Sequence, residues 1–140
     1  MSVISGVYAY LLTDTDVTDD LATYDFGSGA VPAIFTGDVP TDAATPFIAL
    51  SPVGGYLSGR DRGHRGGVVS VDANLWGSKG DSEADLREQA DTLWFSLDRA
   101  PVDVTGMEAV YCLADPPRRL TDSDRFPGFN VTCRILVRKE

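Results

Sequence analysis

The sequence is poor in the residues that build metal centres and disulfides. Among its 140 residues there are two cysteines and one histidine. Cys112 and Cys133 do not have the CxxC spacing of zinc ligands, and His64 has no second histidine to join it, whereas a structural zinc site needs four such ligands. We therefore expect no metal centre. Because both cysteines lie in apolar stretches, we expect them to be reduced and buried.

Basic side chains and long apolar runs are also scarce. Twelve Lys and Arg residues stand against 21 Asp and Glu residues, which gives a formal charge of −9. This balance disfavours a broad grip on duplex DNA, and it suits either simple solubility or the wall of a channel through which DNA slides. Apolar runs such as residues 47–50 are far shorter than the roughly 20 residues that span a bilayer. Residues 1–6 do not resemble a secretory signal, so we expect assembly in the cytoplasm without a membrane partner.

The length and composition are those of one globular domain. Hydrophobic residues make up 43% of the chain and charged residues 24%, both close to the average for folded domains. A chain of this length is long enough for one hydrophobic core, and it contains no internal repeat or low-complexity linker. We therefore treat residues 1–140 as a single domain.

Two stretches have the periodicity of amphipathic helices. Residues 3–12 place apolar side chains at helical spacing, and the Asp- and Thr-rich stretch 13–20 ends or interrupts this pattern. After residue 81 a second apolar stripe recurs at the same spacing, made by Leu86, Ala90, Leu93 and Leu97. Ser82 followed by Asp85 resembles a capping box, so we expect the second helix to begin near residue 82.

The remaining patterns indicate strands. Residues 68–76 and 129–138 alternate apolar and polar side chains, as expected of strands with one face on the core. Residues 47–52, 102–104 and 108–114 are further strand candidates, with a short extended piece at 33–36. The fold class is therefore α+β: an antiparallel or mixed sheet of about four to five strands, with two helices packed on one face. The glycines and proline of residues 27–32 and the polar stretch 115–128 predict loops.

No group of residues is typical of an active site. The carboxylates cluster in what looks like a loop at the end of the first helix, and no nucleophile stands near a base in a recognisable motif. The glycine-rich stretch 54–67 lacks the GxxxxGK[ST] pattern of a phosphate-binding loop. We expect no catalytic residues and no cofactor, and thus not an enzyme.

Two polar segments are candidates for interfaces with other subunits. The first is the glycine-rich loop, which is either a simple hairpin connection or a basic arm that docks on an acidic patch or on DNA phosphates; its candidates are Arg60, Arg62, His64 and Arg65. The second is either a solvated connection or a source of salt bridges between subunits; its candidates are Arg118, Arg119, Asp122, Asp124 and Arg125.

The order of these pieces resembles the phage tail-terminator and tail-completion proteins, including their counterparts in gene-transfer particles. The pieces are a short helix over residues 6–12, a proline-led strand over 45–50, a strand over 71–77 that ends near a tryptophan, a helix starting with Ser82-Glu83-Ala84, and a closing strand after an Arg-rich loop. The resemblance covers nearly the whole chain. The 54–67 loop is longer and richer in glycine than that family's pattern.

This resemblance implies a structural virion protein at the head-proximal end of the tail. Such a subunit assembles as a homo-hexameric ring, ends polymerisation of the tail-tube protein and offers a surface to the head-connector protein, while DNA passes through without specific recognition. A head–tail neck or connector subunit is the nearest alternative. A small α+β ligand-binding or enzymatic domain, with a pocket between the second helix and the sheet, is an alternative of a different class.

Overall fold

The computed structural model describes residues 3–58, 66–78, 82–104, 107–120 and 127–139. The chain has the expected α+β fold, with three helices and eight strands among these residues. In chain order the elements are α1 (Val3–Thr13), α2 (Thr15–Thr18), β1 (Thr23–Asp25), β2 (Ala30–Pro32), β3 (Ile34–Phe35), β4 (Phe47–Ser58), β5 (Gly66–Trp76), α3 (Glu83–Leu97), β6 (Met107–Ala114), β7 (Arg118–Leu120) and β8 (Gly128–Lys139).

Six of the strands form one mixed sheet. Its order is β3-β4-β5-β8-β6, and β7 pairs with the other half of β8, next to β6 along the same side of that strand. Only β3 and β4 run parallel, and all other neighbours are antiparallel. The sheet has one strand more than the upper end of our prediction because β7 forms within the expected loop. The strands β1 and β2 make a separate small hairpin.

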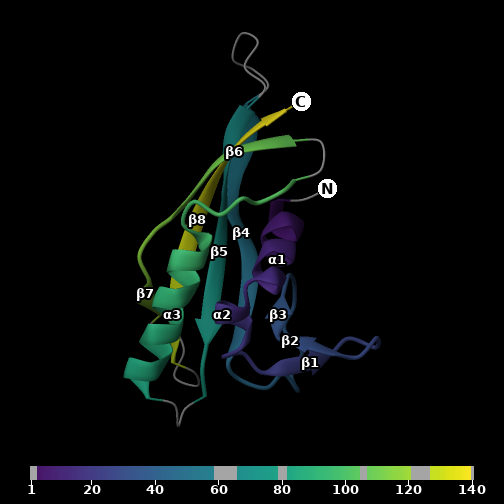
Figure 1. The fold of residues 1–140 in the computed structure, drawn as a ribbon, viewed down its shortest axis with the longest axis vertical. Coiled ribbons are helices and arrows are strands. Elements are labelled where there is room, and N and C mark those ends of the chain that lie inside the picture. Colours follow the sequence, from purple (N-terminus) through teal and green to yellow (C-terminus); the bar gives the residue numbers. More distant parts are fainter. Residues whose placement is uncertain (1–2, 59–65, 79–81, 105–106, 121–126, 140) are drawn as a thin grey trace.

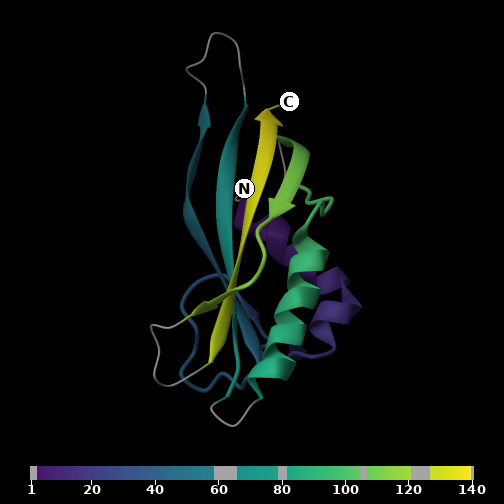
Figure 2. The ribbon, with the colours of Figure 1, turned by 90° about the vertical axis from the view of Figure 1, so that its left-hand side faces the viewer.

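The helices cover one face of this sheet and leave the other face bare. Figures 1 and 2 show α1 and α3 side by side on one side of the strands, with α2 beside α3. The adjoining ends of β4 and β5 extend beyond the helices in both views. The prediction of two helices packed on one face is confirmed, and α2 is a single added turn that follows α1 directly.

The core lies between the helices and the covered face of the sheet. Every second residue is buried there over 71–75 of β5 and 129–137 of β8, because successive side chains of a strand point to opposite faces. Burial of each large side chain contributes about 1.5–3 kcal/mol of transfer free energy. The contributors from these strands and from the helices are Val71, Ala73, Leu75, Phe129, Val131, Cys133, Ile135, Val7, Leu11, Leu86, Ala90, Leu93 and Leu97.

Both cysteines belong to this core, as predicted. Cys112 donates a hydrogen bond from Sγ to the carbonyl of Leu97 at 3.1 Å, and neither thiol is in a disulfide. The hydrogen bond with Cys112, together with burial, raises the pKa of the Cys133 thiol far above its ordinary value. Because the thiolate is the reactive form of cysteine, burial and the raised pKa both disfavour reaction at Cys133.

A second, smaller cluster closes the opposite end of the sheet. Here Phe35 of β3 packs edge-on against Phe47 of β4, with ring centroids 5.6 Å apart. Tyr24 of the β1–β2 hairpin contacts Phe35 from the other side at 5.3 Å. The hairpin is therefore held on the sheet by aromatic packing, since such pairs contribute beyond their buried area.

Four local predictions differ from the structure. The strand predicted over residues 47–52 continues to Ser58, and β5 begins at Gly66, so both ends of the predicted 54–67 loop are strand. Residues 102–104 do not form a strand: Val102 and Val104 are buried beside α1 without pairing in the sheet. Short strands, β2 and β7, lie within the predicted loops. Ser82 precedes α3 at the capping position, yet its side chain makes no cap hydrogen bond.

Candidate protein interaction surfaces

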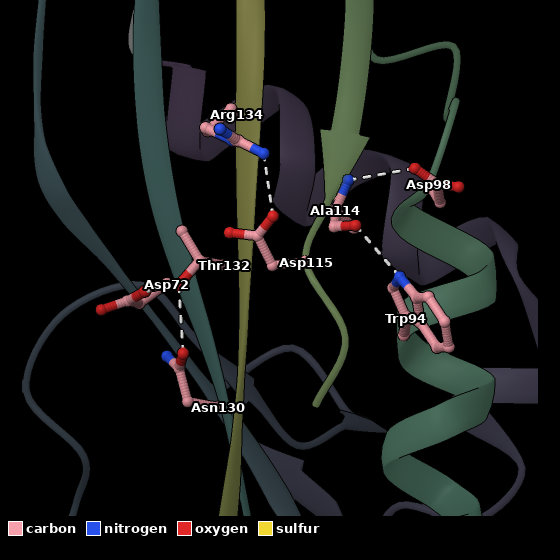
Figure 3. Close-up of polar contacts among 8 residues, drawn as sticks. All are labelled: Asp72, Trp94, Asp98, Ala114, Asp115, Asn130, Thr132 and Arg134. Carbon is pink, nitrogen blue, oxygen red and sulfur yellow. Dashed lines mark hydrogen bonds and ion pairs between the residues drawn. The ribbon is translucent and has the colours of Figure 1, made fainter. Parts of the chain in front are cut away.

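The bare face of the sheet carries a hydrogen-bonded row of polar side chains, here called the polar ladder (Asp72, Asn74, Asn130 and Thr132). Asn130 Nδ2 donates to Asn74 Oδ1 at 2.7 Å, and Thr132 Oγ1 lies 2.6 Å from Asp72 Oδ1 and 3.0 Å from Asn130 Oδ1. Figure 3 shows Asp72, Thr132 and Asn130 converging between β5 and β8. The pairs Asn74–Asn130 and Asp72–Thr132 are each directly opposite in the antiparallel register, where side chains are close enough to interact, and the contact between Thr132 and Asn130 joins them along β8.

The ladder is flanked by arginines. Arg118 of β7 reaches Asn130 Oδ1 at 3.5 Å, and Asn130 is only 3% exposed although it is on the uncovered face. On the other side, Arg134 pairs with Asp115 at 2.8 Å, and Figure 3 shows the two side chains facing each other. The bare face is therefore polar and internally paired over its centre.

Beyond the ladder, the same face becomes apolar. Val68 of β5 and Leu136 of β8 are directly opposite each other in the register. They are 42% and 37% exposed, which places them among the few large apolar side chains left in solvent. Exposed apolar groups that adjoin each other are typical of surfaces that another protein covers.

The end of α3 covers part of one sheet edge. Trp94 Nε1 donates to the carbonyl of Ala114 at 3.0 Å, and the Ala114 N–H donates to Asp98 Oδ1 at 3.1 Å, as Figure 3 shows. The next residue, Arg99, turns the chain with a left-handed φ of 64° and donates its N–H to the carbonyl of Cys112 at 2.7 Å. The outer side of β6 is therefore satisfied over residues 112–114.

The opposite edge is open. The short strand β3 pairs only with Ile48 and Ala49, so in the part of the chain that the structure describes no strand lies beyond β4 from Leu50 onward. The Ile48 N–H donates to the carbonyl of Ala33, away from β5. Since backbone groups of alternate strand residues point to the same side, those of Leu50 and Pro52 also face outward. Pro52 has no N–H, and the pairing with β5 is irregular between Pro52 and Gly54.

Of the interface candidates predicted from the sequence, two are described. Arg119 forms an ion pair with Glu83 at the start of α3, 3.1 Å apart, with both side chains more than half exposed. Arg118 contacts the polar ladder as given above. The remaining candidates lie outside the described residues: Arg60, Arg62, His64, Arg65, Asp122, Asp124 and Arg125.

A groove runs between α1, α2 and α3, and its described lining comes from these helices and the residues that flank α2. One hollow of about 550 Å³ is lined by Tyr10, Asp14, Asp16, Thr92, Phe95 and Ser96. A second of about 320 Å³ shares Thr92 and is lined by Asp20, Asp85, Glu88 and Gln89. We call the two together the acceptor groove. These hollows are not between the second helix and the sheet, where a ligand-binding domain was expected to have its pocket.

The acceptor groove was missed by sequence reasoning. In the sequence, Asp14 is recognisable only as part of an acidic stretch at the end of the first helix, and no sequence pattern indicates a binding role for Phe95. The two residues meet because Asp14 caps α2, accepting the Asp16 N–H at 3.0 Å, and also accepts a hydrogen bond from Ser96 of α3. That contact joins residues 82 positions apart.

Comparison of the chain with models of known protein families and with curated protein sequences found no match. Over the described residues, no group of three or more His, Cys, Asp or Glu side chains is arranged to hold a metal ion. Within those same ranges, no helix has both the length and the apolar character needed to cross a bilayer. The interaction surfaces therefore have to be interpreted from their own chemistry.

Proposed function

We propose that this chain is a ring-forming structural subunit of a phage tail, which ends polymerisation of the tail tube and joins the tail to the head connector. The observation that carries the proposal is the open β4 edge in a sheet that ends, on its other side, in a second edge strand, β6. The order of elements, which resembles the tail-terminator proteins, and the α+β fold with both long helices on one face are consistent with it.

The directions of the strands suit pairing between copies. Because β4, β5, β8 and β6 are antiparallel in turn, β6 runs opposite to β4. A second copy that places its β4 beside β6 of the first would therefore continue the sheet in antiparallel fashion. Such a head-to-tail contact uses two different surfaces, and it forms a closed ring when the rotation between copies closes. It would also cover edge groups that otherwise invite aggregation.

Two features restrict where this pairing occurs. The cap from α3 occupies residues 112–114 of β6, and Pro52 leaves one outward position of β4 without a donor. The contact would thus be confined to the part of the sheet that extends beyond the helices (Figure 2). The exposed pair Val68 and Leu136 lies on the bare face, level with the part of β4 beyond Pro52, because Val68 is opposite Tyr56. A neighbour that also covers this face would bury apolar surface there.

The first test is the mass of the purified protein in solution, alone and with tail-tube protein, by light scattering. Six copies of the 15.0 kDa chain give a species of about 90 kDa. We expect this species, either alone or on tube ends. A monomer that ignores the tube at high concentration would refute the proposal. Capping of tube growth would favour a terminator, and binding to connector alone would favour a neck subunit.

The second test locates the interface. Val68→Asp should prevent assembly, whereas Phe26→Ser, which also removes an exposed apolar side chain, should not. In the assembled species the backbone N–H of Leu57, which is opposite Gly67 in the part of β4 beyond Pro52, should exchange with solvent more slowly than in the monomer. The N–H of Val131, in a strand paired on both sides, serves as the control and should be unchanged. Equal exchange of Leu57 in both species would show that the β4 edge is not the interface.

A further inference from the structure

We propose that the acceptor groove binds an arginine-bearing segment of a separate partner protein. This inference does not depend on the ring, because the described residues that line the groove belong to the helices and to the residues that flank α2, and none belongs to the strand edges. Figures 1 and 2 show α2 against the side of α3, where the groove is formed.

The groove offers hydrogen-bond acceptors, and its hydroxyl donors are already used. Tyr10 Oη donates to the carbonyl of Ser96 at 2.9 Å, Ser96 Oγ donates to Asp14, and Thr92 Oγ1 donates to the carbonyl of Glu88 at 3.1 Å. The carboxylates that line it are Asp14, Asp16, Asp20, Asp85 and Glu88. A ligand that fits must therefore bring donors and positive charge.

A second observation points to a donor ligand. Gln89 lines the smaller hollow, and its Oε1 is buried without a hydrogen-bond partner among the described residues. Leaving such an acceptor unpaired costs about 1–3 kcal/mol, so a donor that reaches this amide would be stabilised. Because none of the described lining residues is basic, the described part of the chain places no cation in the groove.

The shape of the groove distinguishes an extended cationic segment from a metal ion. The carboxylates are spread along two hollows that share Thr92, and no three of them are grouped as metal ligands. A chain with two or more cationic side chains in succession could occupy both hollows. Nucleic acid is excluded on charge, since its phosphates would face these carboxylates.

The aromatic wall favours arginine over lysine. Phe95 is 68% exposed, and its ring stacks on Trp94 with centroids 4.8 Å apart and planes inclined by 22°. Trp94 is anchored in turn by its bond to Ala114. A guanidinium is planar, stacks on aromatic faces and pairs with carboxylates through two parallel hydrogen bonds, whereas an ammonium is a compact point charge. Phe95 and the nearby carboxylates thus present the two contacts that a guanidinium makes.

The test is titration of the isolated protein with three short peptides that are identical except for two positions, occupied by arginine, lysine or citrulline. Trp94 reports binding by fluorescence in a Trp76→Phe background, because the chain has two tryptophans. We expect saturable binding of the arginine peptide that weakens with salt, weaker binding of the lysine peptide and none of the neutral citrulline peptide.

Matched variants distinguish binding in the groove from nonspecific attraction of a cationic peptide to an acidic protein. Phe95→Ala should weaken binding about two- to fivefold, the equivalent of an exposed cation–π contact, and Asp16→Asn should weaken it by a similar factor. The controls Phe26→Ala and Asp38→Asn, which remove an exposed ring and an exposed carboxylate outside the groove, should leave binding unchanged. Equal effects of groove and control variants would overturn the proposal, as would equal binding of the citrulline peptide.

One further outcome identifies a different occupant. In this outcome the protein self-associates, and both Asp16→Asn and the arginine peptide dissociate the assembly. The groove is then occupied by a second copy of the chain, and the proposal of a separate partner protein is overturned. If the assembly persists in both cases while the peptide still binds, the ring and the groove act independently and the inference stands. Failure of ring formation alone leaves the peptide result unaffected.

Discussion

Replacing Gly6 with alanine tests whether helix propensity or side-chain packing has the larger effect on stability at this position. Gly6 is buried in the middle of α1, where alanine would ordinarily stabilise the helix by about 0.5–1 kcal/mol. A Cβ added at this position, however, would overlap the backbone carbonyl oxygen of Asp103 and lie 3.1 Å from Cγ1 of Val102. A backbone oxygen cannot rotate away as a side chain can, so α1 would have to move from the segment 102–104.

The packing effect should exceed the gain in propensity. Adding a methyl group to a filled core usually costs about 1–3 kcal/mol, and the neighbour here is rigid. We therefore expect Gly6→Ala to lower the free energy of unfolding by about 1 kcal/mol and by at most about 2.5 kcal/mol, the difference between these two contributions. Urea unfolding followed by tryptophan fluorescence measures it, and a lower midpoint with an unchanged slope would indicate a loss of stability alone.

The control for this experiment is on the same helix. Ala9 is exposed, so Ala9→Gly isolates the propensity contribution and should cost about 1 kcal/mol. A Gly6→Ala variant that is more stable than the parent would show that no close approach exists. The position of residues 102–104 against α1 would then be wrong.

Three further predictions concern the periphery of the fold. Gly128→Ala should displace the Trp76 ring, whose Cε3 lies 2.6 Å from an added Cβ, so the tryptophan emission should shift and stability should fall by about 1–3 kcal/mol; an unchanged spectrum would contradict this contact. Arg119→Ala breaks an exposed ion pair and should cost less than about 1 kcal/mol, an effect that added salt removes; a larger loss would mean a buried role. Partial desolvation and the hydrogen bond to Asp42 raise the pKa of Tyr24. Its favoured state is the protonated one, so its contribution to stability should persist below the ordinary tyrosine pKa and be lost as pH rises through the higher folded value. Ultraviolet titration should show a late component that is lost in Tyr24→Phe and that Asp42→Asn moves to lower pH.

The long elements could be predicted because each has one buried face. The alternation over residues 68–76 and 129–138 and the helical stripe after residue 82 match β5, β8 and α3 closely. In β4 the prediction ended at Pro52, where a proline and two glycines suggested a break. The strand continues to Ser58 because its pairing with β5 resumes after the irregularity, and a neighbouring strand can hold a segment whose own residues favour a turn.

The short elements could not be predicted because their own residues do not determine them. β7 is polar and three residues long, and it is a strand only because β8 offers it a free edge. Conversely, Val102 and Val104 have the apolar alternation of a strand and are buried against α1 without one. In both cases tertiary contacts overrode local preference.

The candidate sites depend on the same long-range contacts. Each strand contributes two residues to the polar ladder, and these are recognisable in the sequence as polar positions of the alternating pattern. Which residue of β5 pairs with which residue of β8 follows from the strand register alone. The acceptor groove combines residues from both ends of the helical layer, and no spacing in the sequence brings Asp16 near Phe95. Arg119 could be named as a candidate from its charge, but its ion pair with Glu83 could not be predicted from the sequence.

The polar ladder also has a consequence for how the chain folds. Its partners are 56 and 60 residues apart in the sequence, so β8 and β5 must pair across a long intervening segment of chain. A mispairing by a single residue would turn Asp72 and Asn74, or their partners in β8, toward α3, where a buried carboxylate or amide without a donor is strongly unfavourable. The ladder therefore selects the correct strand register. It adds little to the stability of the correctly paired sheet, but it makes sheets whose pairing is shifted by one residue too unstable to persist.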